Sequence, residues 1–141
     1  MKFRSLFVAC MISLTLIGSV SCKKEAEQQV TDVITKLMTD GTWRVTNFTE
    51  NSTAITSSFN GWVFKFNDNY TVTATMGSTV YTGSWQSNMS TQTISAQFAS
   101  TVGNPIIKLN GTWNIGNSSL TVGSFTQTKS GIPYTMELTK N

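Results

Sequence analysis

The stretch Gly61-Trp62-Val63-Phe64-Lys65-Phe66-Asn67 decides the fold class of this chain. Its three aromatic residues occupy every second position and would share one face of a strand, while Val63 and Lys65 would share the other. The segment Asn67-Asp68-Asn69 predicts a turn, because Asn and Asp tolerate positive φ and bond to nearby backbone. Alternation then resumes from Tyr70 to Met76. The pattern predicts an antiparallel hairpin with one aromatic face.

Period-two alternation rich in Thr, Val and aromatic residues continues on both sides of this hairpin. Further strands are predicted at residues 42–49, 78–86, 93–99, 106–115, 119–127 and 132–140, with breaks at 77, 87–88, 103–105, 116–117 and 130–131. Gly123 lies inside a strand pattern and predicts a β-bulge. Eight short strands with evenly spaced turns predict a mainly β, antiparallel barrel or sandwich. The absence of a long helix between them in the sequence pattern argues against a parallel α/β fold.

A helix is predicted before the first strand. Apolar residues recur there at i, i+3, i+4, i+7 and i+8, namely Val30, Val33, Ile34, Leu37 and Met38. Asp40-Gly41 ends the pattern, since Gly suits the position after a helix. The apolar face could lie on a membrane surface. We favour the alternative that it packs on the β-domain and closes one end.

The first part of the chain is typical of a secretory signal. Lys2 and Arg4 precede an apolar run from Leu6 to Ile17, which is shorter than the roughly 20 residues needed to span a bilayer. The segment Ser19-Val20-Ser21-Cys22 resembles a lipobox, the site at which bacteria acylate a cysteine and cleave just before it. Ser19 departs from that pattern, in which an aliphatic residue is usual.

We therefore expect lipidation at Cys22, with several fatty acyl chains such as palmitate, as in bacterial lipoproteins. Ordinary cleavage after Ser21 is the alternative, because Ser19-Val20-Ser21 is also a small-x-small site. The chain would then divide into a signal peptide (1–21), a lipidated tether with a short amphipathic helix (22–40) and a β-domain (41–141). Cys10 would leave with the signal, so the mature chain would contain no disulfide.

Removal of the signal also changes the charge. The whole chain carries ten basic and seven acidic residues, and loss of Lys2 and Arg4 leaves eight basic residues and a net charge of +1. The remaining basic residues of the β-domain are scattered along the chain. Nucleic-acid binding would require a basic stripe with interleaved aromatic residues, so we expect no nucleic-acid partner.

Reactive side chains are scarce. The sequence contains no His, and no Cys follows Cys22. This excludes His bases, Cys nucleophiles and the ordinary zinc ligands. The carboxylates of the β-domain are Glu50 at a loop, Asp68 in a turn and Glu137 on a solvent-facing strand position. We expect no catalysis, no metal site and no cofactor, because one carboxylate at residues 67–69 makes a poor calcium site.

Three segments share a Gly-x-Trp pattern: Gly41-Thr42-Trp43, Gly83-Ser84-Trp85 and Gly111-Thr112-Trp113. Gly permits close backbone approach, and Trp supplies a large apolar plug with one polar group. In a small barrel, such a pair closes an end or turns a corner.

Gly41-Thr42-Trp43, at the start of the first strand, resembles the lipocalins, whose corresponding Trp plugs the barrel base. Residues 22–141 as a whole resemble the lipocalin-like lipoproteins of Gram-negative bacteria. The resemblance includes the strand Gly61-Trp62-x-Phe64-x-Phe66 and the terminal Met136-Glu137-Leu138-Thr139-Lys140. It implies a small antiparallel eight-stranded lipocalin-like barrel. The late Arg that stacks on the first Trp in lipocalins is missing, and Lys140 is a weak substitute.

Two functional hypotheses follow, and neither is enzymatic. In the first, the barrel of a membrane-anchored lipoprotein binds a small hydrophobic or amphipathic ligand against interior aromatic side chains. The candidate ligand-binding residues are Trp43, Trp62, Phe64, Phe66, Trp85, Phe98 and Trp113. In the second, these residues fill a packed barrel, and the protein is an envelope structural or adaptor protein that contacts protein or glycan partners. Both place it in the cell envelope, lipid-anchored at the outer membrane through Cys22, with the periplasmic or surface side and the oligomeric state undecided.

Overall fold

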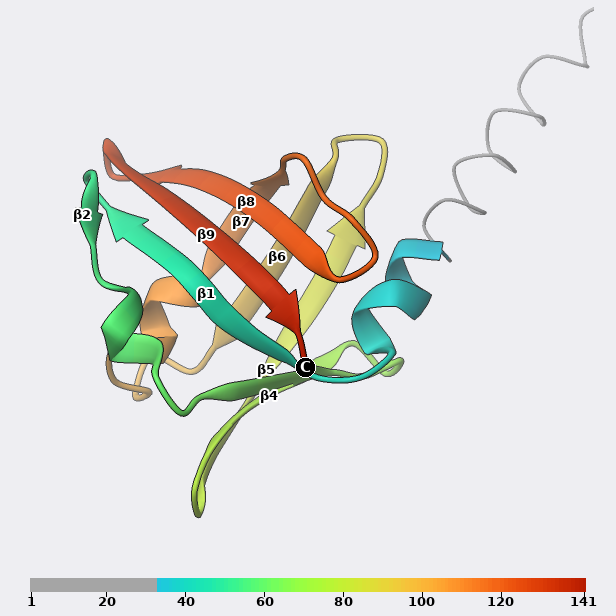
Figure 1. The fold of residues 1–141 in the computed structure, drawn as a ribbon, viewed down its shortest axis with the longest axis horizontal. Coiled ribbons are helices and arrows are strands. Elements are labelled where there is room, and N and C mark those ends of the chain that lie inside the picture. The colour runs from blue at the N-terminus through green and yellow to red at the C-terminus, as the bar shows by residue number, and fades with distance from the viewer. Residues whose placement is uncertain (1–32) are drawn as a thin grey trace, which may run out of the picture.

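Eight antiparallel strands close into a barrel in the computed structural model, which describes residues 33–141 (Figure 1). The barrel strands are β1 (Trp43–Glu50), β3 (Val63–Phe66), β4 (Thr71–Met76), β5 (Thr79–Asn88), β6 (Thr93–Phe98), β7 (Gly111–Ile115), β8 (Val122–Lys129) and β9 (Ile132–Lys140). The short strand β2 (Thr53–Ala54) folds back on the end of β1. The predicted mainly β fold with a short N-terminal helix is confirmed.

Each strand from β3 onward pairs with the next, and β1 closes the barrel against β9. The β1–β9 ladder runs from Trp43 opposite Lys140 to Glu50 opposite Tyr134, with a bulge between Val45 and Asn47. The pairing between β1 and β3 is confined to Trp43 opposite Phe64. The wall is therefore continuous except at the β1–β3 seam, where the 3₁₀ helix η1 (Thr56–Phe59) lies beside β1.

The N-terminal helix packs on one end of the barrel, as the apolar periodicity predicts. Residues 33–39 are helical, Met38 is buried, and Ile34 and Leu37 are partly buried against the core. Val33 at the start of this segment is 63 % exposed, and Val30 lies outside the described residues. The ammonium group of Lys65 donates hydrogen bonds to the carbonyl oxygens of Thr39 and Gly41 and so holds the end of the helix to β3.

Residues 106–115, predicted as one strand, form two elements instead. Ile106–Leu109 is the 3₁₀ helix η2, and β7 begins at Gly111. Between them, the side chain of Asn110 takes the place of a strand partner. Its Oδ1 accepts from the N–H of Phe98 at 2.7 Å, and its Nδ2 donates to the C=O of Phe98 at 2.9 Å. This exchange satisfies the end of β6 without a backbone ladder, so the chain is free to coil at η2.

The bulge predicted at Gly123 is wrong. Gly123 pairs opposite Leu138 in an unbroken β8–β9 register. A Cβ at this position would lie 2.7 Å from the ring of Phe125, so the glycine is required by close packing of that ring. The predicted break at residues 87–88 is also displaced, because β5 continues to Asn88.

The turn predicted at residues 67–69 is confirmed, with one difference. Asn67 and Asn69 both hydrogen-bond to Thr71, as expected for side chains that stabilise turns. The residue with positive φ is Tyr70, at 61°.

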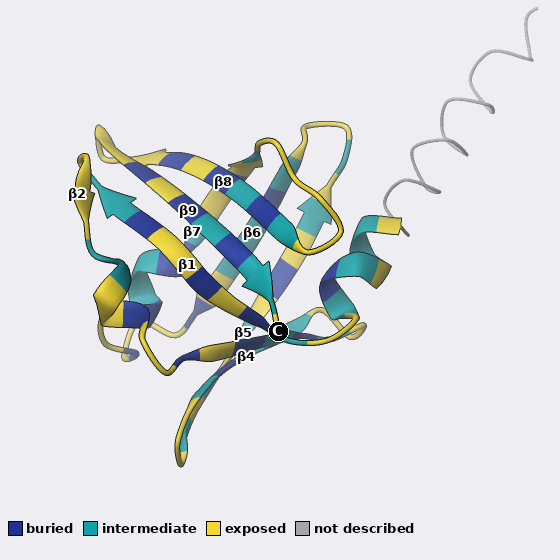
Figure 2. Cartoon of the chain, viewed as in Figure 1, coloured by how far each residue is buried: buried dark blue, intermediate teal, exposed yellow. Residues whose placement is uncertain are grey.

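Buried residues alternate with half-buried or exposed residues along the strands (Figure 2). The inward residues form one continuous core that extends from Met38 in the N-terminal helix to Phe59 in η1 and Ile106 in η2. Within residues 33–141, no helix is long and apolar enough to cross a membrane.

Candidate functional site

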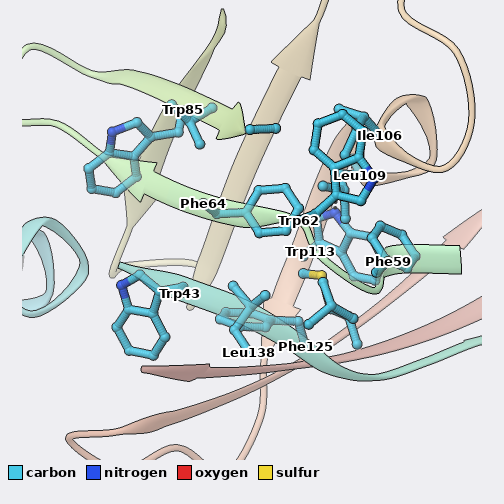
Figure 3. Close-up of a cluster of buried hydrophobic side chains, with 14 of the residues drawn as sticks. Trp43, Phe59, Trp62, Phe64, Trp85, Ile106, Leu109, Trp113, Phe125 and Leu138 are labelled. Atoms are coloured by element: carbon cyan, nitrogen blue, oxygen red, sulfur yellow. Dashed lines mark hydrogen bonds between the residues drawn. The ribbon is translucent and has the colours of Figure 1, made fainter. Parts of the chain in front are cut away.

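The seven candidate ligand-binding aromatics are all core residues. None of their side chains is more than 6 % exposed. Figure 3 shows five of them (Trp43, Trp62, Phe64, Trp85 and Trp113) among the buried side chains. They do not form a single site, because they serve different parts of the barrel.

Each Trp of the three Gly-x-Trp segments donates a hydrogen bond from its indole N–H to a segment that lies outside the barrel strands. The indole N–H of Trp43 donates to the carbonyl of Met38 in the helix at 2.9 Å. The indole of Trp85 donates to Asn67 in the β3–β4 turn at 3.0 Å, and that of Trp113 to Leu109 in η2 at 2.9 Å. Each buried indole thus has its polar group satisfied, and the bond of Trp43 joins the first barrel strand to the N-terminal helix.

The barrel interior is filled. Its central void measures about 30 Å³ and is lined by apolar side chains, among them Phe64, Phe66, Phe98 and Trp113. A second void of about 30 Å³ lies between the helix and the barrel, beside Trp43. Small-molecule sites are typically about 300 Å³ or larger. A ligand of that size would require several core side chains to move.

Trp62 occupies a different position, at the opening of the barrel wall. Its ring stacks on that of Tyr81, with ring centroids 5.6 Å apart and planes 21° from parallel. It also lines a groove of about 390 Å³ at the β1–β3 seam, together with Arg44, Val45 and Phe59. The groove is open to solvent and has both polar and apolar walls.

A polar cluster joins three segments that are distant in sequence. The carboxylate of Glu50 accepts from the ammonium of Lys108 at 2.7 Å and from the hydroxyl of Tyr134 at 2.7 Å. The hydrogen bond from Lys108 is the main cause that lowers the pKa of Glu50, and Glu50 raises the pKa of Tyr134. No local pattern signals this cluster, because its members are 58 and 84 residues from Glu50 along the chain.

The remaining carboxylates lie apart from one another. Asp40 pairs with Lys140 at 2.7 Å, a contact that lowers the pKa of Asp40, and Glu137 accepts from the hydroxyl of Thr46 at 3.1 Å. Lys140 is also the strand partner of Trp43, and its side chain covers Gly41. Across residues 33–141, no three His, Cys, Asp or Glu side chains gather at one place.

Charged and uncharged side chains lie on different parts of the outer surface. Residues 69–128 contain one charged residue, Lys108, which is paired with Glu50. The outward positions of β4 to β8 follow from the cross-strand registers and the inward burial of their neighbours. We call these positions the uncharged face: Thr71, Thr73, Thr75, Val80, Thr82, Ser84, Gln86, Asn88, Thr93, Ser95, Gln97, Thr112, Asn114, Val122, Ser124, Thr126 and Thr128. All except Val80 and Val122 carry a hydroxyl or an amide.

Cys22, the predicted lipidation site, lies outside the described residues, as do the signal and tether segments.

Comparisons with known proteins support the fold. No protein-family model matches the sequence, and no curated protein matches it. Among solved structures, the fold is similar to that of a DUF4847 family protein from Bacteroides vulgatus ATCC 8482, with a TM-score of 0.59 and 16 % sequence identity. The similarity covers 77 % of this chain and 97 % of that one. At this identity, it shows a shared barrel fold.

Proposed function

We propose that this protein is a lipid-anchored, non-catalytic lipoprotein of the bacterial cell envelope, similar to the lipocalin-like lipoproteins, which binds a partner with the outside of a packed barrel. The filled interior is the observation that carries this choice between the two binding hypotheses. A central void of about 30 Å³ favours external recognition over an internal ligand.

The anchor is supported by the order of the N-terminal residues. A basic start, a short apolar run and a small-residue segment precede Cys22, and a polar segment follows it. Replacement of Cys22 by Ser would remove the acylated sulfur. We expect Cys22→Ser to move the protein from the membrane fraction to the soluble fraction. Complete retention in membranes would contradict the anchor.

The uncharged face supports the second part of the proposal. It offers many hydroxyl and amide groups and no charge, so it suits a neutral protein or glycan that forms hydrogen bonds. The face itself carries no charged side chain, and the charged residues nearest to it lie at its borders, with Lys65 on β3 opposite Thr73 and Glu137 on β9 opposite Ser124. Since salt mainly screens interactions between charges, binding to this face should change little with ionic strength.

Site-specific photo-crosslinking in intact cells tests this assignment. A photoreactive phenylalanine analogue would replace Gln86 or Thr112 on the uncharged face, and Thr135 on β9 would serve as the exposed control. We expect adducts larger than the monomer from the first two positions and not from the third. Adducts of equal yield at all three positions, or at Thr135 alone, would refute recognition by this face.

The internal-ligand hypothesis has its own test. Native mass spectrometry of protein purified from host membranes should show the lipidated chain without a further small molecule. A stoichiometric small molecule that survives purification would overturn the choice made here and return the function to the barrel interior.

A further inference from the structure

We propose that two copies of this chain pair edge to edge through the N-terminal half of β5, and so join their uncharged faces into one continuous sheet. The β4–β5 hairpin projects beyond the rest of the barrel wall (Figure 1). There β5 has β4 on one side, and its pairing with β6 begins only at Gly83 opposite Phe98. Residues 79–82 of β5 therefore form a sheet edge.

The backbone groups on this edge can be identified from the hydrogen bonds nearby. The N–H of Trp85 donates to the carbonyl of Tyr70, on the β4 side, at 2.9 Å. Successive residues of a strand face opposite neighbours, and the β4–β5 register from Thr71–Ser84 to Met76–Thr79 is unbroken. Hence the backbone N–H and C=O of Tyr81 point toward β4, whereas those of Val80 and Thr82 point to the opposite side, away from β4.

The position of β6 shows that this direction is open. The backbone N–H and C=O of Phe98 both bond to Asn110 on the β7 side. The last residue of β6 whose backbone groups point toward β5 is therefore Gln97, which lies opposite Ser84. Beyond Phe98 the chain turns, with the N–H of Val102 donating to the C=O of Ala99 at 3.0 Å. Among residues 33–141, no strand continues beside Val80 and Thr82.

The edge lacks the features with which proteins usually prevent pairing. Lys, Pro, inward charges or bulges commonly protect an exposed strand edge. Here the segment Thr79-Val80-Tyr81-Thr82 contains none of these, and Val80 is 57 % exposed. Val63 lies on the same outer face through Thr75 and is also exposed.

A second copy fits this edge better than a charged partner does. Residues 69–107 contain no charged side chain, so two identical faces meet without electrostatic repulsion. A twofold axis at Tyr81 places Val80 opposite Thr82 of the second copy, and the reverse. Both pairs exchange N–H···O=C bonds in an antiparallel ladder, which makes the contact self-complementary. Confinement of both copies to a membrane by the proposed Cys22 anchor would favour the encounter.

Disulfide trapping in the full-length chain tests this pairing. The double variant Val80→Cys/Thr82→Cys places thiols on hydrogen-bonded pairs about 5.5 Å apart between Cα atoms, within reach of a disulfide. Thr112→Cys/Asn114→Cys is the matched control, because it has the same spacing on the same face but lies on a strand paired on both sides. We expect a disulfide-linked dimer from the first variant in membranes, and none above the level of the unmodified chain from the control.

A charge variant gives an independent readout. Val80→Lys puts a cation on the exposed edge without touching the core, so the circular dichroism spectrum should not change. We expect light scattering of the purified, detergent-solubilised chain to show a twofold loss of protein mass relative to the unmodified chain. Equal trapping of both cysteine pairs, absence of dimer from the edge pair, or a dimeric Val80→Lys variant would each overturn the proposal.

Discussion

Gly83 lies where β5, already paired with β4, begins to pair with β6, and it allows the two backbones to approach closely. A Cβ at this position would lie 2.5 Å from the carbonyl oxygen of Gln97 and 2.9 Å from the ring of Phe98. The oxygen belongs to the β6 backbone, so relief of the clash would separate β5 from β6. We expect Gly83→Ala to lower the free energy of unfolding by about 1–3 kcal/mol, as overpacking does.

Chemical denaturation measures this effect, and Gly103→Ala is its control. No atom lies within 4 Å of a Cβ built at Gly103, and its φ is not in the left-handed region. This variant should keep the stability of the unmodified chain within about 0.5 kcal/mol. Equal stabilities of the two variants would mean that β6 does not approach Gly83 so closely.

Glu50 should make stability depend on pH. Its pKa is lowered by Lys108 and Tyr134, so the ionised form is favoured in the folded chain. The resulting stabilisation is present above the ordinary Glu pKa of about 4.3 and is lost as the pH falls through the lower folded value. We expect Glu50→Gln to flatten the decline in the free energy of unfolding below about pH 5.

Glu137→Gln provides the comparison for this experiment. Glu137 bonds to Thr46 and lies in neither of the two ion pairs found among residues 33–141. In this variant, the free energy of unfolding should decline with falling pH as steeply as in the unmodified chain.

Tyr134 should make stability depend on pH in the alkaline range. Its pKa is raised, so its contribution is present below about pH 10 and is lost as the pH rises through the higher folded value.

At the scale of elements, the N-terminal helix depends on one buried side chain. Met38 is the helix residue that is buried against the core, and its carbonyl oxygen accepts a hydrogen bond from the indole N–H of Trp43. We expect Met38→Ala to lower the free energy of unfolding by about 2–5 kcal/mol, because the cavity collapses only in part. Val33→Ala, at an exposed position of the same helix, should stay within about 0.5 kcal/mol.

Thermal and denaturant unfolding of the two helix variants would decide the point. If Met38→Ala proved as stable as Val33→Ala, the helix would not be an integral part of the barrel domain. Near-ultraviolet circular dichroism adds a second readout, since loss of helix packing should change the surroundings of Trp43.

Elements were predictable where a repeating pattern determines them. Alternation of aromatic and polar residues located β3, and the i, i+3, i+4 spacing located the helix. The segment 106–109 shows the limit of this reasoning. The apolar segment Ile106-Ile107-Lys108-Leu109 is typical of a strand. It forms the 3₁₀ helix η2 instead, because Asn110 pairs with the backbone of Phe98, twelve residues away. Such a contact depends on the tertiary arrangement and leaves no periodic signal.

At the scale of the whole molecule, some features also follow from the sequence pattern, while others depend on tertiary packing. Residues 69–128 carry a single charged side chain, so an uncharged outer surface over β4 to β8 was within reach of the sequence through strand alternation. All seven candidate aromatics are buried in the core, but they lie in different parts of it. Whether they leave room for a ligand was not predictable, since a filled barrel and one with a small cavity can be built from the same residue types.

Phe125 offers a test of the filled interior at this scale. Its ring lines both the central void and the void under the helix, each about 30 Å³. Phe125→Ala should cost about 3–5 kcal/mol and merge the two voids into one apolar cavity. Engineered apolar cavities of about 150 Å³ stay dry and bind benzene or xenon. We therefore expect benzene to raise the melting temperature of Phe125→Ala but not that of the unmodified chain.

Phe59→Ala separates this effect from a general loss of packing. Phe59 is just as buried, but it lies at the β1–β3 groove and lines neither of these two voids. Its removal should destabilise the fold by a comparable amount and open a site toward solvent, which benzene would not occupy. Stabilisation of the unmodified chain by benzene would instead mean that the core opens readily, and the interior would again be a credible ligand site.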